Sequence, residues 1–204
     1  MTSAARADSP SSPYAVLAKP KATWTYEVLR PRSHKPTGTR LTVTVTSVRA
    51  AGAYTVIETS TTATPPGGSD YELPPLIVGP DGVHAVMNLE AQGPNGGNDY
   101  SEANIRALYQ DQYLPTIYLP AALAKGKAKL DLDRFGQDDR VYALTVTTSQ
   151  PDKHTWRVAW KGTYTVPEDE SGAKTRLGAS NDFDPAVGLT RICLEDDTCL
   201  RLVP

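Results

Sequence analysis

The clearest pattern along the chain is an alternation of apolar and polar side chains within short segments. It covers residues 24–28, 41–46 and 53–62, and a period of two is typical of a β-strand with one buried face. Threonine occupies many of the polar positions and adds strand propensity. Gly52 lies between the second and third segments, so the sequence predicts that these two strands pair as a hairpin.

A second hairpin is predicted around residues 79–82, which read Gly-Pro-Asp-Gly. Proline presets one turn dihedral and glycine permits positive φ, so the flanking segments 76–78 and 83–89 are expected to pair. Residues 92–99 are rich in Gly and Asn and predict a mobile loop. The polar stretch 168–180 is also predicted to be an exposed loop.

One short helix is predicted to begin at Ser101. Apolar and long side chains recur at helical spacing from Ile105 through Tyr109 to Gln112. Ser101 is a favourable N-cap residue, and Pro115 stops a helix from continuing. The sequence therefore predicts a single helix between two sets of strands.

The alternation returns after Pro120 and is longest over residues 156–166, which are predicted to form a long central strand. The sequence thus contains eight or more short strands and few helices. This content favours a mainly-β fold, either a strongly curved antiparallel sheet (a half-barrel) or a barrel, with one short helix.

The domain organisation follows from where the alternation begins. Residues 1–19 are rich in Ser, Ala and Pro and lack hydrophobic periodicity, so we expect a flexible N-terminal lead, the tether that follows a removed export signal. Residues 20–204 are expected to form one antiparallel β domain, because all-β folds often use this length for a single core.

Charge and hydropathy argue against nucleic-acid binding and against a membrane-spanning segment. The chain has 21 basic and 23 acidic residues, a net charge of −2, which lacks the basic excess of a nucleic-acid-binding protein. No run of 18 or more apolar residues occurs in the sequence, so no transmembrane segment is predicted.

Two cysteines are spaced for a cross-strand pair. If Cys193 faces Cys199, residues 195–197 form the turn, and the sequence predicts a disulfide rather than two free thiols. Two cysteines without a matching pair of histidines do not make a zinc site. A disulfide implies an oxidising compartment, hence an extracytoplasmic location: periplasmic, attached as an outer-membrane lipoprotein, or secreted.

The same hairpin register places Arg191 opposite Arg201. Like charges repel across a strand pair unless water or a bound anion screens them. Two solvated arginines near the acidic turn are the favoured interpretation, and an anion contact is the alternative.

No catalytic or metal-binding motif is present. The histidines are His34, His84 and His154; they lie in separate segments without a second ligand at metal-binding spacing. There is no nucleophile elbow, phosphate-binding glycine loop or His-Glu-x-x-His sequence. We expect a non-enzymatic protein with no cofactor and no metal.

Carboxylate clusters are predicted to be solvated. Residues 131–136 begin like a calcium loop, but Phe135 holds the fifth position and Tyr142 stands where the bidentate Glu belongs. An acidic loop containing Asp131 and Asp133 is the favoured interpretation. Asp182 and Asp184 are likewise assigned to a polar loop.

Aromatic side chains supply the candidate binding residues. They gather in a Tyr-rich segment, expected to lie over the concave face of the sheet, and in the stripe of residues 156–166. Such side chains give large contact areas in ligand pockets, although they are also ordinary core residues. The candidates for ligand binding are Tyr109, Tyr113, Tyr118, Trp156, Trp160 and Tyr164.

Three short motifs carry a family resemblance: residues 21–26 (Lys-Ala-Thr-Trp-Thr-Tyr), 79–83 and 184–190 (Asp-Pro-Ala-Val-Gly-Leu-Thr). They resemble the opening Gly-x-x-Trp-x-Tyr and the closing Pro-Gly-Val-Gly-Leu of bacterial envelope domains related to the LolA/LolB-type lipoprotein carriers. Lys21 and Ala186 replace family glycines. In those carriers a curved sheet and a covering helix enclose an apolar cavity.

The resemblance and the aromatic stripe together favour an extracytoplasmic binding module for a lipid-like or other apolar ligand. The alternative is an interaction or assembly protein that docks another envelope protein. A hydrolase is the third hypothesis.

Overall fold

The computed structural model describes most of the chain. The described residues are 12–68, 71–80, 82–85, 100–103, 105, 117–135, 140–165, 174–194 and 196–204, with side chains left out at 129–135, 140–144, 164–165 and 174–177.

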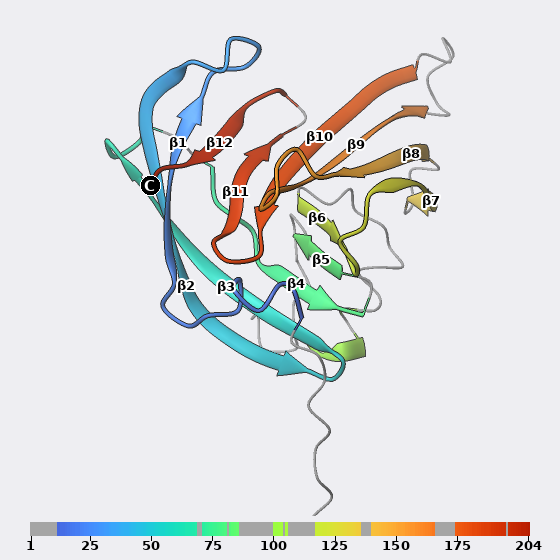
Figure 1. The fold of residues 1–204 in the computed structure, drawn as a ribbon, viewed down its shortest axis with the longest axis horizontal. Coiled ribbons are helices and arrows are strands. Elements are labelled where there is room, and N and C mark those ends of the chain that lie inside the picture. Colours follow the sequence, from blue (N-terminus) through green and yellow to red (C-terminus); the bar gives the residue numbers. More distant parts are fainter. Residues whose placement is uncertain are drawn as a thin grey trace, which may run out of the picture.

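Twelve β-strands in the described residues form a single antiparallel sheet (Figure 1). The strand order is β6-β5-β4-β3-β2-β1-β12-β11-β10-β9-β8-β7. The strands are β1 (Thr23–Leu29), β2 (Pro36–Ala51), β3 (Tyr54–Thr64), β4 (Leu76–Gly79), β5 (Gly82–Ala85), β6 (Ile117–Pro120), β7 (Gly126–Phe135), β8 (Arg140–Ser149), β9 (Trp156–Thr165), β10 (Lys174–Asp184), β11 (Gly188–Cys193) and β12 (Cys199–Leu202).

The mainly-β antiparallel fold is confirmed, and so are both predicted hairpins. β2 pairs with β3 across Gly52, and β4 pairs with β5 next to Gly82. Both glycines have positive φ (61° and 126°), which their lack of a side chain permits. The barrel alternative is wrong: β6 and β7 stand at the two ends of the strand order, and within the described residues they do not pair with each other.

The sheet folds over so that β6 lies against β10. With its carboxamide oriented to satisfy both neighbours, buried Asn181 accepts a hydrogen bond from the Tyr118 backbone N–H and donates one to the Ser180 carbonyl, each at 3.2 Å. The Tyr14 hydroxyl donates to the carbonyl of Pro120. Edge-strand groups of β6 are therefore satisfied by side chains of other elements rather than by a further strand.

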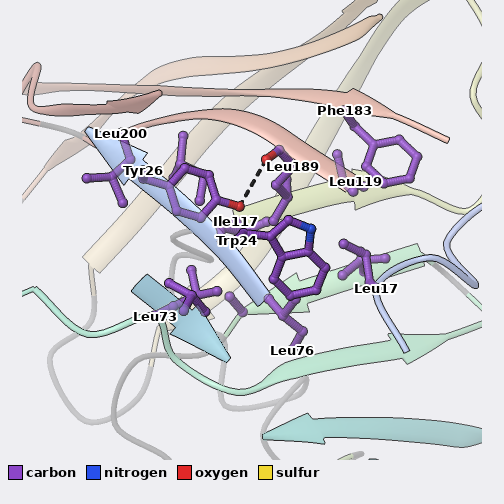
Figure 2. Close-up of a cluster of buried hydrophobic side chains, with 14 of the residues drawn as sticks. Leu17, Trp24, Tyr26, Leu73, Leu76, Ile117, Leu119, Phe183, Leu189 and Leu200 are labelled. Atoms are coloured by element: carbon purple, nitrogen blue, oxygen red, sulfur yellow. Dashed lines mark hydrogen bonds between the residues drawn. The ribbon is translucent and has the colours of Figure 1, made fainter. Parts of the chain in front are cut away.

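The folded sheet buries one face as the core (Figure 2). In it, Trp24 donates from Nε1 to the Val187 carbonyl (3.0 Å), and the Tyr26 hydroxyl donates to the Leu189 carbonyl (2.9 Å). Burial raises the pKa of Tyr26, so its phenol stays protonated and remains a donor. The buried residues of this cluster include Leu41, Val43, Ile57, Leu76, Ile117, Leu119, Val158, Trp160, Phe183, Ile192 and Leu200.

The segment preceding β1 contributes to this core. Tyr14 and Leu17 are 2% and 1% exposed, and the Tyr14 ring lies 5.1 Å from that of Phe183. Residues 12–19 thus differ from the flexible lead expected over residues 1–19. The remainder of that segment, residues 1–11, lies outside the described residues.

Two predicted acidic loops are instead strands. Residues 174–180 of the predicted loop 168–180 belong to β10, which continues through the buried polar residues Asn181 and Asp182; residues 168–173 lie outside the described residues. Asp131 and Asp133 lie on β7, paired with β8. Hydrophobic alternation misses a strand such as β10, because hydrogen bonds satisfy its buried polar side chains.

Two other predictions differ in extent. β9 is flanked by β8 and β10 as an interior strand, but the middle of the sheet is formed by β1 and β12. Of the predicted helix, residues 102, 103 and 105 are helical, and the Ile105 N–H donates to the Ser101 carbonyl (2.9 Å). The loop at 92–99 and the rest of the helix lie outside the described residues. In the described part of the chain, no helix has the length and hydrophobicity needed to cross a bilayer.

Candidate functional site

The β11–β12 hairpin forms with the predicted register. Cys193 pairs with Cys199, and the two are joined by a disulfide. The Leu194 N–H donates to the Thr198 carbonyl (2.8 Å), and Asp197 closes the turn with positive φ (64°). A disulfide in this position agrees with an oxidising environment.

A row of charged residues crosses five strands on the outer face of the sheet, the face opposite the core. The register aligns Arg157 with Asp182, Asp182 with Arg191, and Arg191 with Arg201, as predicted for the last pair. Arg201 in turn faces Glu27 on β1. We call these five residues the charge row. Its members come from β9, β10, β11, β12 and β1, so only the folded sheet brings them together.

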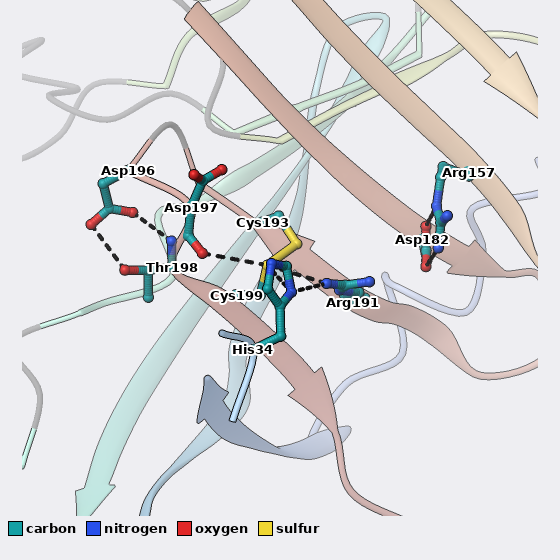
Figure 3. Close-up of a disulfide and its surroundings, with 9 residues drawn as sticks. All are labelled: His34, Arg157, Asp182, Arg191, Cys193, Asp196, Asp197, Thr198 and Cys199. Carbon is teal, nitrogen blue, oxygen red and sulfur yellow. Dashed lines mark hydrogen bonds and ion pairs between the residues drawn. A yellow bond between two sulfur atoms is a disulfide. The ribbon is translucent and has the colours of Figure 1, made fainter. Parts of the chain in front are cut away.

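Two arginines of the charge row are neutralised by carboxylates. Arg157 donates from Nε and Nη2 to the two oxygens of Asp182, both at 2.7 Å (Figure 3). The hydrogen bonds to Asp182 raise the pKa of Arg157. Arg201 donates from Nε (3.0 Å) and Nη2 (2.7 Å) to Glu27. Asp182 is therefore a buried, paired group on β10 (7% exposed) and not the solvated loop residue that the sequence predicted.

Arg191, the central arginine, has no carboxylate partner among the described residues. Its Nη2 donates to Nδ1 of His34 (2.6 Å) and approaches the Cys199 sulfur at 3.5 Å, as Figure 3 shows. Because a guanidinium only donates, the His34 Nδ1 must be the acceptor. The Arg191 Nε is buried and lacks a hydrogen-bond partner in the described part of the chain. This arginine thus keeps its positive charge and unused donors.

The loop between β1 and β2 positions His34. The Arg30 N–H donates to the Lys35 carbonyl (2.9 Å), and the His34 N–H donates to the Arg30 carbonyl (3.0 Å). His34 itself has a left-handed backbone (φ 51°). The sequence interpretation of His34 as an isolated residue missed this contact, because it joins positions 157 residues apart.

Beside the charge row, small side chains create a cleft in the outer face. The register aligns Thr147 with Ala159, Ala159 with Ser180, and Ser180 with Cys193. Short side chains leave a depression of about 480 Å³ between longer neighbours, which we call the outer cleft. It is lined by His34, Thr147, Arg157, Ala159, Trp160, Lys161, Gly178, Ala179, Ser180, Arg191, Cys193, Leu194, Asp197 and Cys199.

The outer cleft carries a positive excess. Its lining includes three cations, Arg157, Lys161 and Arg191, and one carboxylate, Asp197. Since Asp182 neutralises Arg157, two uncompensated cations remain against one carboxylate. A volume of this size is ordinary for a small-molecule site. The cleft offers hydrogen-bond donors and an apolar floor. Its described lining holds no evident nucleophile paired with a general base.

Three of the aromatic residues predicted to bind a ligand have described side chains, on β9 and β6. Trp160 is buried in the core cluster (3% exposed) and Trp156 is half-buried at the start of β9. Tyr118 is half-buried on β6, between the core residues Ile117 and Leu119, and its ring lies 5.1 Å from that of His84. Asn181, which bonds to the Tyr118 N–H, faces Val158 on β9.

The other predicted binding residues are not described in the same detail. Tyr109 and Tyr113 lie outside the described residues. Tyr164 lies on β9 opposite Tyr142, and its side chain is among those left out. Their role in ligand binding stays a prediction.

Metal ligands do not gather in the described residues: no group of three or more His, Cys, Asp or Glu side chains there could hold an ion. No protein-family model matches the chain, and no curated protein or solved structure is significantly similar to it. The class of ligand must therefore be argued from the chemistry of the outer cleft.

Proposed function

We propose that this protein is a non-enzymatic binding module that works outside the cytoplasm and holds a small ligand in the outer cleft. The observation that carries this proposal is the combination of a 480 Å³ depression with the side chain of Arg191, which has no carboxylate partner among the described residues. An apolar floor with a few convergent polar groups is the usual composition of a ligand site. The Cys193–Cys199 disulfide supports an extracytoplasmic location.

A substitution that fills the cleft tests this proposal. Ala159 lies on the cleft floor on the outer face, so Ala159→Trp occupies the depression without entering the core. Thr42→Trp is the matched control, because Thr42 is a half-buried outer-face residue of β2 away from the cleft. Ligand-observed NMR with fragments of mixed charge should find binders to the parent that Ala159→Trp loses and Thr42→Trp retains. The proposal is wrong if the fragments bind Ala159→Trp equally well, and its non-enzymatic part is wrong if bound fragments are chemically altered.

An apolar ligand within the curved sheet is a second candidate. It is favoured by the placement of β6, which is held to β10 by Asn181 rather than by a strand ladder, at the end of an aromatic-rich inner face. The resemblance of the sequence motifs to lipoprotein-carrier domains also favours an apolar ligand. Separation of β6 from β10 would open the core near Trp160 to a lipid-like molecule.

A neutral apolar dye distinguishes this candidate from the first. Saturable Nile red fluorescence, displaced by a fatty acid and weakened by Trp160→Phe but unaffected by Ala159→Trp, supports the inner site. Absence of both dye binding and a co-purified lipid in native mass spectra would rule it out.

A further inference from the structure

We infer that the outer cleft recognises an oxyanion, a carboxylate or phosphate group carried on a small organic molecule, and that Arg191 is its anchor. This inference rests on the proposed function and names the ligand class of the same cleft. It depends on three features of the described residues: the unused donors of Arg191, the fixed position of its side chain, and the remainder of the cleft, which holds the second cation Lys161 and a floor of small residues.

The first feature is the state of the Arg191 guanidinium. It carries five N–H donors, and the described contacts use only those of Nη2. Arg157 and Arg201, its neighbours in the charge row, each have a carboxylate at 2.7 Å. A half-buried guanidinium without an ion-pair partner is costly, whereas an oxyanion contacted by the unused Nη1 donors supplies the missing counter-charge.

The second feature is the fixed position of this arginine. The contact with His34 holds Nη2, and the disulfide lies directly beside it. Arg201 faces Arg191 in the register, but Glu27 neutralises Arg201 and is not available to Arg191. An anion bound at Arg191 would neutralise the second arginine of this facing pair.

The third feature is the remainder of the cleft. Lys161 is exposed on β9, with Gly178 opposite it, and the facing residues Ala159 and Ser180 lie between Lys161 and the charge row. The depression is several times larger than a lone phosphate or carboxylate group needs. It therefore fits an organic ligand whose anionic group contacts Arg191 and whose body covers the alanine and glycine floor. Asp197, the one carboxylate among the described lining residues, disfavours ligands with several negative charges near the turn.

Matched probes separate charge from shape. Benzoate and benzamide have nearly the same size, but only benzoate is an anion. Phenyl phosphate, compared with benzoate, tests whether the cleft prefers a phosphate or a carboxylate. Inorganic phosphate, compared with phenyl phosphate, tests whether the organic body of the ligand contributes to binding. Binding is followed by NMR shifts of the backbone amides of Ser180 and Cys193 and of the Arg191 side chain. We expect benzoate or phenyl phosphate to bind at least about tenfold more tightly than benzamide, with a salt-dependent affinity.

Substitutions then assign the contact. Arg191→Gln should weaken the organic anion by about tenfold or more, the scale of a charge-assisted bidentate contact. Arg40→Gln, which makes the same change in net charge on exposed β2, should leave the affinity within about twofold. Asp182→Asn should strengthen binding, because it frees the charge of Arg157.

The outcomes distinguish the two levels of the proposal. If benzamide binds the cleft as tightly as benzoate, or if Arg191→Gln and Arg40→Gln behave alike, the cleft is a binding site but the anion inference is overturned. If none of the four probes shifts the cleft amides up to its solubility limit, while Ala159→Trp still abolishes binding of other fragments, the anion inference alone fails. If no fragment of any charge depends on Ala159, the proposed function fails as well.

Discussion

The ion pair between Arg157 and Asp182 should contribute asymmetrically to stability. The two hydrogen bonds are both 2.7 Å long, but the side chain of Asp182 is only 10% exposed whereas that of Arg157 is 42% exposed. Loss of the arginine leaves a nearly buried carboxylate without a described partner. Loss of the carboxylate leaves an arginine that water can still solvate.

The expected magnitudes follow from this difference in exposure. Exposed pairs contribute about 0–1 kcal/mol, and breaking a fully buried pair costs about 3–5 kcal/mol. Arg157→Met, which keeps the apolar stem, should lower the free energy of unfolding by about 2–3 kcal/mol. Asp182→Ala should lower it by about 1 kcal/mol, and the double variant should lose at least about 1 kcal/mol less than the sum of the two.

Urea unfolding followed by circular dichroism, with the disulfide intact, measures all four proteins. The cycle of Arg201→Met and Glu27→Ala is the control, because the same kind of pair is more exposed there (53% and 21%) and its coupling should stay below about 1 kcal/mol. Equal costs for Arg157→Met and Asp182→Ala, or strictly additive costs, would refute the assignment of Asp182 as a buried partner.

Three further predictions concern the core, the hairpin and a loop. Asn181→Leu removes the bond to the Tyr118 N–H and should cost about 1–3 kcal/mol while speeding hydrogen exchange of that amide; unchanged exchange would show that β6 is held otherwise. Replacing both cysteines by serine should cost about 2 kcal/mol of unfolding free energy, because the closed loop is short, and a loss above about 4 kcal/mol would contradict a purely local role. The backbone N–H groups of His154 and Thr155 donate to the Asp152 carboxylate (both 2.8 Å) and lower its pKa below the ordinary 3.8. Its stabilising effect should be present above pH 3.8 and lost as pH falls through the lower folded value; an NMR titration midpoint at or above 3.8 would contradict this.

The sequence predicted those parts of the fold whose signals are local. The β2–β3 and β4–β5 hairpins were recognisable because glycines at positive φ separate two alternating segments. The disulfide register followed from the spacing of Cys193 and Cys199 alone. A hairpin carries its pairing within a few residues, so no knowledge of the distant chain is needed.

The missed parts depend on contacts between distant segments. Much of β10 was predicted to be a loop because its sequence is largely polar, whereas Asn181 and Asp182 are buried there and are satisfied by Tyr118 from β6 and Arg157 from β9. Tyr14 and Leu17 lie in irregular chain, where two isolated apolar residues show no period. Hydrophobic alternation records only burial on a regular strand and misses these cases.

The part of the candidate site that lies within one hairpin could be predicted from the sequence. Arg191 and Arg201 meet within one hairpin, and their juxtaposition was predicted. His34 contacts Arg191 from the β1–β2 loop, and Asp182 aligns with Arg191 from β10. The sequence does not reveal which strands and loops become neighbours, so these two placements were missed. The depression itself arises because Ala159 and Ser180 become neighbours, and small residues on separate strands give no pattern along the chain.

Selective labelling of a cysteine on the cleft floor tests the central claim most directly, namely that the outer face of β8–β12 carries an accessible, positively charged cleft. In Ala159→Cys, an anionic methanethiosulfonate should react at least about tenfold faster than a cationic one of similar size, and added salt should reduce the ratio. Val158→Cys, on the inner face and 0% exposed in the parent, should react with neither in the folded protein. Equal rates for the two reagents at position 159, or faster labelling at position 158, would contradict the account.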